Sequence, residues 1–148
     1  MINVLLILLH LYFPSVEFES INISPDFLLI LIIFNSFYLS DSKTIFLGFS
    51  VGLLKDFLIM SNYLGFLTLI SISFSYLLVK VKIYKNKSLH YFLFFIFIFI
   101  YSFSSYFLKY SISYSFYFKF AIIHSVVTFI SFYFLRLIIE RFSKIEKS

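Results

Sequence analysis

Charged residues divide this chain into long apolar blocks. The blocks cover residues 1–13, 27–40, 44–79, 88–108 and 120–135. The third block contains only two charged residues, Lys55 and Asp56. A helix over its whole length would extend about 54 Å, whereas the hydrocarbon core of a bilayer is about 30 Å thick. The third block must therefore fold back, and residues 60–65, which include Ser61, Asn62 and Gly65, have the composition of a turn.

This division predicts six helices, two of which form a hairpin within the third block. The expected helices cover approximately residues 1–16, 26–40, 44–60, 64–82, 88–109 and 117–140, and a short tail covers residues 141–148. The expected fold is a single all-α integral membrane domain with about six transmembrane helices. The first two apolar segments are short for a crossing. An arrangement of five crossings, with the first segment lying on the membrane surface, therefore stays open.

Composition supports lipid as the solvent of this chain. Hydrophobic residues make up 61% of the 148 residues and charged residues 13%, whereas soluble domains have about 25% charged residues. These proportions leave no room for a soluble catalytic domain. The absence of cysteine excludes disulfides, thiolate metal sites and thiol nucleophiles. The sequence also has no paired carboxylates at catalytic spacing and no HExxH motif, so no enzyme activity, metal or cofactor is predicted.

The charges predict an orientation in the membrane. The net charge is +5, and the basic residues cluster beside apolar segments. This placement favours contact with anionic lipid rather than with nucleic acid. The basic segments 80–87 and 136–147 are expected on the cytoplasmic side. Both termini are then cytoplasmic, and the acidic segment 17–26 is external. The expected location is the bacterial inner membrane.

Four residues spaced by four form one ridge of the third helix: Thr44, Gly48, Gly52 and Asp56. The G-x-x-x-G spacing lets another helix backbone approach closely. Asp56 lies one turn further on, near the turn that contains Gly65. Its carboxylate is expected to accept hydrogen bonds from free N–H groups at the start of the next helix, which would hold the hairpin together. Binding of a partner or a polar ligand by Asp56 is the alternative.

The acidic segment offers further candidate contact residues. Glu17, Glu19, Pro25 and Asp26 lie there, and Pro25-Asp26 is typical of a helix start with an aspartate N-cap. Lys55 is expected to extend to the outer membrane interface, with its charge in water. A salt bridge from Lys55 to one of the acidic residues of this segment is the less favoured alternative.

Two histidines are solitary polar residues within apolar segments, His10 and His124. Each is expected to make one hydrogen bond between helices rather than to carry protons or bind a metal.

The ordered motifs resemble the MreD family of bacterial rod shape-determining proteins. They read Pro25-Asp26-Phe-Leu-Leu-Ile-Leu, then Gly48-Phe-Ser-Val-Gly52-Leu-Leu-Lys-Asp56, then Tyr63-Leu64-Gly65. The resemblance covers residues 25–82. It implies a non-catalytic subunit that works with MreC, the MreB filament, a RodA-type glycosyltransferase and a class B penicillin-binding protein. It also implies a fold similar to the substrate-binding subunits of energy-coupling-factor vitamin transporters.

Three functions are weighed on this basis. A scaffold would hold MreC and the wall synthases through the Gly48/Gly52 ridge and the segment 17–26. A small-molecule-binding subunit of a membrane transporter is the alternative, but its polar candidates are few: Asp56, Asn62 and His124. An enzyme acting on lipid-linked substrates is disfavoured, because no acidic pair has catalytic spacing.

Overall fold

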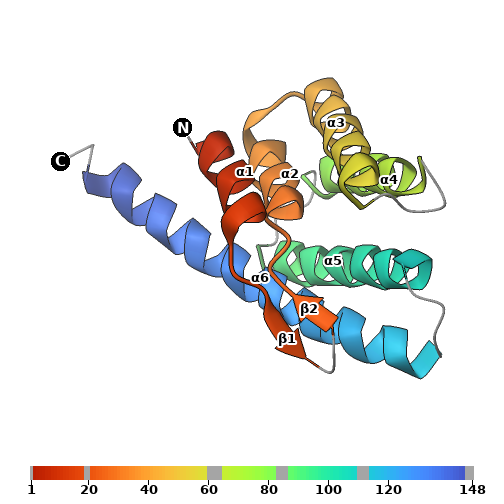
Figure 1. The fold of residues 1–148 in the computed structure, drawn as a ribbon. Coiled ribbons are helices and arrows are strands. Elements are labelled where there is room, and N and C mark those ends of the chain that lie inside the picture. Colours follow the sequence, from red (N-terminus) through yellow and green to blue (C-terminus); the bar gives the residue numbers. More distant parts are fainter. Residues whose placement is uncertain (1, 19–20, 60–64, 83–86, 110–113, 146–148) are drawn as a thin grey trace.

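The computed structural model describes residues 2–18, 21–59, 65–82, 87–109 and 114–145. These residues form six helices and one β-hairpin (Figure 1). In chain order the elements are α1 (Ile2–Tyr12), β1 (Val16–Phe18), β2 (Ile21–Ile23), α2 (Phe27–Tyr38), α3 (Asp41–Ile59), α4 (Phe66–Val81), α5 (Lys87–Lys109) and α6 (Tyr114–Ile145). The described chain is therefore a helical bundle with a small β-hairpin beside it.

The segment between the first two helices differs from the expectation. The first helix ends at Tyr12, earlier than residue 16, because Pro14 follows and cannot continue a helix. β1 and β2 then pair antiparallel, with Glu17 opposite Asn22. Ile21 and Ile23 are buried while Asn22 is exposed, which is the alternation of a half-buried strand. This part of the expected loop is therefore a β-hairpin.

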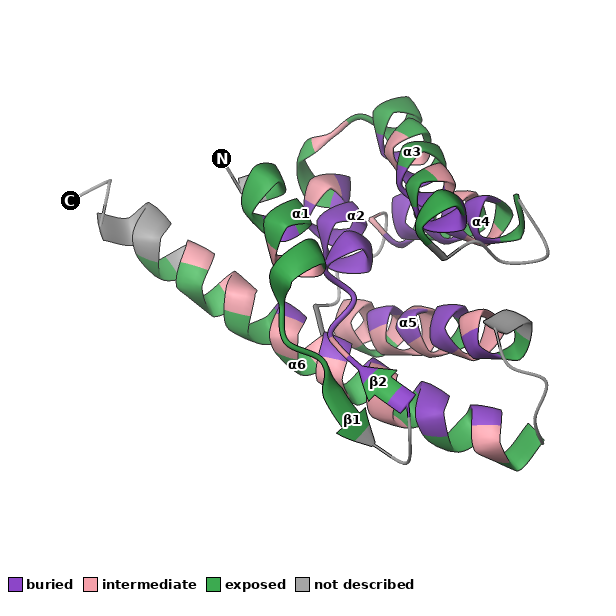
Figure 2. Ribbon diagram, viewed as in Figure 1, coloured by how far each residue is buried: buried purple, intermediate pink, exposed green. Residues whose placement is uncertain are grey.

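Helix α2 forms the centre of the bundle. It contacts α1, α3, α4 and α6, and every residue from Phe27 to Phe34 is buried (Figure 2). This run is apolar on all sides, and a helix of that kind needs neighbours on every face. Asp26 caps the helix, because its side chain accepts a hydrogen bond from the Leu29 N–H at 3.1 Å.

Helix α1 packs against α2 rather than away from the bundle. Leu6 is buried in the main core. Asn3 and Asn35 form a reciprocal pair of amide hydrogen bonds, at 2.8 and 3.3 Å. Such a pair leaves neither amide unsatisfied in an apolar setting.

The other four helices form two hairpins. Helices α3 and α4 pack closely on each other, and α5 and α6 lie side by side (Figure 1). Aromatic rings join α6 to α2 and α5, as in Phe34–Phe132 at 5.4 Å and Phe95–Phe129 at 5.7 Å between centroids. α6 also begins before and ends after the expected 117–140, because its mixed-charge end continues as helix.

The surface of the described chain suits a lipid environment. Leu89–Phe107 and Tyr114–Ile139 are long and apolar enough to cross a membrane, and three shorter apolar helices accompany them. Large apolar side chains such as Phe46, Phe57 and Phe134 are exposed. In water such a surface would drive aggregation, whereas in lipid it needs no covering.

Candidate functional site

The glycine ridge of α3 lies directly against α4. A Cβ atom added to Gly48 would lie 1.9 Å from Ser75 Oγ and 2.8 Å from the Ser71 carbonyl oxygen. A Cβ atom added to Gly52 would lie 2.5 Å from Thr68 Cα. Glycine is needed at both positions because the two helix backbones nearly touch.

Because of this packing, the residues of the ridge are not exposed to a partner protein. Gly48, Gly52 and Thr44 are buried within the chain's own hairpin. The Thr44 hydroxyl donates to the Ser40 carbonyl oxygen at 3.1 Å, so it is also used internally. The ridge is therefore a packing surface for α4, and the expectation that it contacts a partner protein is not retained.

Asp56 joins the end of α3 to the start of α4. Its carboxylate accepts hydrogen bonds from the backbone N–H groups of Gly65, Leu67 and Thr68 at 3.0–3.3 Å, and from the Thr68 hydroxyl at 2.5 Å. These N–H groups would otherwise lack partners at a helix start. Gly65 has φ +90°, a left-handed conformation that favours glycine. Residues 60–64 of the expected turn lie outside the described residues.

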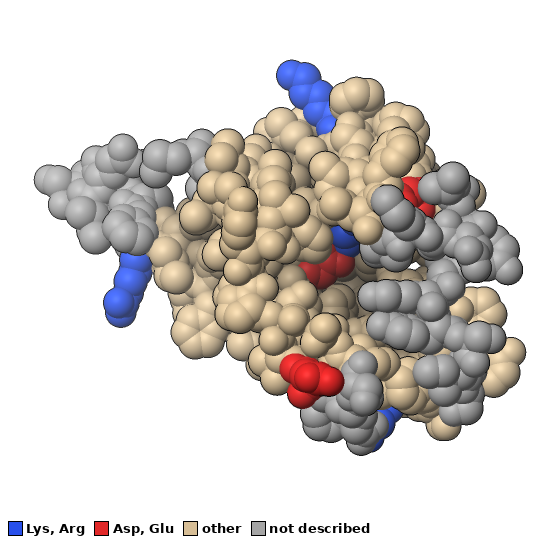
Figure 3. Space-filling model, in the orientation of Figure 1, with Lys and Arg blue, Asp and Glu red and all other residues tan. Residues whose placement is uncertain are grey.

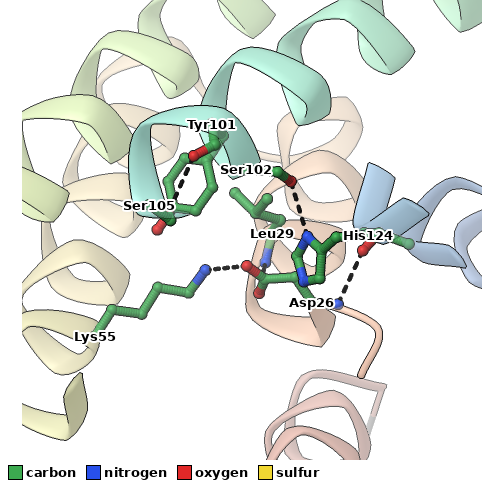
Figure 4. A network of polar contacts seen from close by, with 8 residues as sticks. Asp26, Leu29, Lys55, Tyr101, Ser102, Ser105 and His124 are labelled. Carbon is green, nitrogen blue, oxygen red and sulfur yellow. Dashed lines mark hydrogen bonds and ion pairs between the residues drawn. The ribbon is translucent and has the colours of Figure 1, made fainter. Parts of the chain in front are cut away.

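Lys55 corrects the expectation that its charge reaches the membrane interface. Lys55 is 3% exposed, and its side chain forms an ion pair with Asp26 (Figure 4). Its Nζ also lies 4.4 Å from the centre of the Tyr101 ring, a cation–π contact. On α3, Lys55 points about 100° away from Asp56, and this direction faces the start of α2. The alternative of a salt bridge to the acidic segment is the one observed.

Asp26 is buried and connects α2, α3 and α6, so it is not exposed for contact with a partner. It is 7% exposed. Its carboxylate caps α2 and binds Lys55 of α3, while its backbone N–H donates to Thr128 Oγ1 of α6 at 3.1 Å. Pro25 is buried beside it, whereas Glu17 is exposed on β1. Glu19 lies outside the described residues.

The two histidines differ in their contacts. His124 of α6 forms a hydrogen bond through Nδ1 with Ser102 Oγ of α5 at 2.8 Å, which confirms the expected bond between helices. Nδ1 of His10 is buried and has no hydrogen-bond partner among the described residues, so the bond between helices stays a prediction for His10. His10 lines a cavity.

These polar residues surround one cavity of about 230 Å³. The lining includes His10, Asp26, Lys55, Tyr101, Ser102 and His124. Basic and acidic atoms lie side by side in a hollow near the centre of the face in Figure 3. The cavity thus gathers side chains from α1, α3, α5, α6 and the start of α2.

Sequence reasoning singled out His10, Asp26, Lys55 and His124, but not that they meet at one cavity. It considered Asp56, Asn62 and His124 as ligand groups, but Asp56 is used in the hairpin and Asn62 lies outside the described residues. Tyr101 and Ser102 lie in a segment rich in aromatic residues and serine, and nothing in that pattern distinguishes these two positions. The usable signals were the charge of Lys55 and the two solitary histidines within apolar blocks.

The arrangement offers hydrogen bonding and paired charge rather than an evident reaction centre. Among the described residues, no group of three histidine, aspartate or glutamate side chains is placed to hold a metal ion.

Comparison with known proteins agrees with the motifs. The family model described as rod shape-determining protein MreD matches residues 1–143. No curated protein and no solved structure matches the chain. The match covers nearly the whole length and includes the hairpin, the acidic segment and the cavity. This chain therefore belongs to the MreD family of rod shape-determining membrane proteins.

Proposed function

We propose that this chain is a non-catalytic membrane subunit of the bacterial cell-elongation complex. It binds an MreC-like protein and, through it, the MreB filament, a RodA-type glycosyltransferase and a class B penicillin-binding protein. In this way it organises peptidoglycan synthesis and maintains cell shape. The family match over residues 1–143 is the observation that carries this proposal.

In the membrane, we propose a multi-pass arrangement with six crossings and both termini in the cytoplasm. Lys80 and Lys82 at the end of α4, and Arg136 and Arg141 near the end of α6, support this orientation because basic residues favour the cytoplasmic side. The fold proposed for the bundle is that of the substrate-binding subunits of energy-coupling-factor transporters.

The β-hairpin is the surface proposed for the MreC-like partner. Other candidate residues already have contacts within the chain: Gly48 and Gly52 pack against α4, and Asp26 forms an ion pair with Lys55. Glu17 is exposed on β1, and neighbouring Val16 is 70% exposed. In the described sheet β1 pairs only with β2, and the free edge of a strand can accept a partner strand.

A charge reversal tests this surface. Glu17→Lys should reduce co-purification of the MreC-like protein without lowering the amount of the chain in the membrane. The matched control is Asp41→Lys, at the exposed start of α3, which should leave co-purification unchanged. Equal recovery with Glu17→Lys and wild type would reject the hairpin as the contact surface.

Depletion tests the function as a whole. Cells that lose the chain should become round, and expression of the wild-type chain should restore rods. Unchanged cell shape on depletion, or no recovery of MreC with the wild-type chain, would reject the proposed function itself.

A further inference from the structure

The buried Lys55–Asp26 pair has hydrogen-bonding capacity that the described chain does not use. Asp26 accepts one bond from Leu29 N–H through Oδ1 and one from Lys55 through Oδ2. An ionised carboxylate can accept about four hydrogen bonds and an ammonium group can donate three. The pair therefore still offers both a negative and a positive contact to the cavity.

Two further polar atoms at the cavity lack partners. His10 Nδ1 and the Tyr101 hydroxyl are buried, and neither makes a hydrogen bond of good geometry among the described residues, although the Tyr101 hydroxyl faces Lys55 and Ser71. Both residues line the cavity, and Tyr101 is only 2% exposed. Buried polar atoms are nearly always satisfied in folded proteins. A polar occupant of the cavity would satisfy them.

The dimensions of the cavity limit the occupant. Its volume of about 230 Å³ lies below the range of about 300–1,000 Å³ that is usual for drug-sized ligands. A small polar group fits this space.

Charge limits the occupant further. Lys55 and Asp26 together are neutral, so a ligand with a net charge would add an uncompensated charge to a buried site. A group with one positive and one negative charge adds none. It can also match both members of the pair, with its anion at Lys55 and its cation at Asp26.

We propose that the cavity between His10, Asp26, Lys55 and Tyr101 binds a small zwitterionic group, with an ammonium a few bonds away from a carboxylate or phosphate. A free amino acid has this chemistry, and so does the phosphoethanolamine headgroup of a lipid. This site is independent of the partner proteins proposed above.

The absence of cysteine makes a direct test possible, since one introduced cysteine carries the only thiol. Ser105→Cys places a thiol at the cavity, where the native hydroxyl donates to the Tyr101 carbonyl oxygen. The purified variant is reconstituted in phosphatidylglycerol nanodiscs, and its reaction rate with a small thiol reagent is measured.

Three additions separate the sources of the ligand. Alanine and glycerophosphoethanolamine, a phosphodiester that is zwitterionic at neutral pH, are added in solution, and phosphatidylethanolamine is added in the bilayer. Slower labelling with the soluble compounds supports a free ligand, and slower labelling with the lipid supports a headgroup. Acetate and ethanolamine, which carry one charge each, should give no protection. Labelling that no zwitterion slows, or that only an MreC-like protein slows, overturns the proposal.

Variants at the pair sharpen the test. In the Ser105→Cys background, Lys55→Met should weaken protection by roughly thirtyfold or more. Lys82→Met removes a lysine from an ion pair with Asp41, away from the cavity, and should leave protection unchanged. Tyr101→Phe keeps the ring over Lys55 and removes only the hydroxyl, so it should fold and bind several-fold more weakly. Equal protection in Tyr101→Phe and in a folded Lys55→Met variant would overturn the proposed contacts.

Discussion

At the scale of single residues, Asp56 accepts four hydrogen bonds from the start of α4. One carboxylate accepts from the N–H groups of Gly65, Leu67 and Thr68, and from the Thr68 hydroxyl. Each of these donors would otherwise be left unsatisfied in an apolar hairpin. The negative charge also lies at the positive end of the α4 dipole.

Asp56→Ala should therefore lower the free energy of unfolding by about 2 kcal/mol or more, because a cap and several buried bonds are lost together. Asp56→Asn should be milder, since the amide oxygen still accepts. Thermal or denaturant unfolding of the purified chain in detergent measures both. Asp41→Ala, at an exposed acid, is the control, and a similar loss there would contradict the interpretation.

The Lys55–Asp26 pair allows a second prediction. Lys55→Met leaves Asp26 charged, buried and unpaired, which should cost about 3–5 kcal/mol. Adding Asp26→Asn removes that charge while keeping an N-cap residue, so the double variant should be more stable than the sum of the single effects implies. Lys82→Met, in the partly exposed and longer pair with Asp41, should cost at most about 1 kcal/mol. Additive losses for the buried pair in a double-mutant cycle would refute the coupling.

At the scale of elements, the α3–α4 hairpin depends on backbone contact. Gly52→Ala places its Cβ against Thr68 Cα, which cannot move aside without separating the helices. We expect a loss of about 1–3 kcal/mol for this overpacking, and Gly52→Leu should prevent assembly of the hairpin. The unfolding free energy and the yield of folded protein are the measurements.

Gly65 gives a contrast for the same experiment. No heavy atom of the described chain lies within 4 Å of an added Cβ, so Gly65→Ala is strained only through its φ of +90°. Its cost should be about 1–2 kcal/mol, and Gly65→Asn should recover part of it. If Asn were as harmful as Ala here, the left-handed conformation would not be the cause.

The hairpin could be predicted from the sequence because its signals are local. Gly48, Gly52 and Asp56 fall on one face by spacing alone, and Gly65 follows at a turn. The direction of Lys55 could not be predicted, because it depends on how α3 is rotated against α2. The position of Tyr101 and Ser102 at the cavity likewise depends on how α5 packs against elements that are distant in the sequence. Nothing in their own segment distinguishes them from its other tyrosines and serines.

At the scale of the whole molecule, the number of crossings can be measured with single cysteines. A membrane-impermeant thiol reagent should label Glu17→Cys from outside the cell. It should label Asn3→Cys and Arg141→Cys only after permeabilisation. External labelling of Asn3→Cys would instead favour five crossings, with α1 on the outer surface. Labelling of Glu17→Cys and Arg141→Cys from the same side would contradict the proposed orientation.

Helix α6 has a mechanical consequence. Its 32 residues extend about 48 Å as one rod, longer than the roughly 30 Å hydrocarbon core of a bilayer. In the proposed six-crossing arrangement, the excess projects without a hinge as a rigid arm. A protein bound to this arm would move together with the α5–α6 pair rather than independently of it. Force or rotation on one side of the bilayer would therefore reach the opposite side.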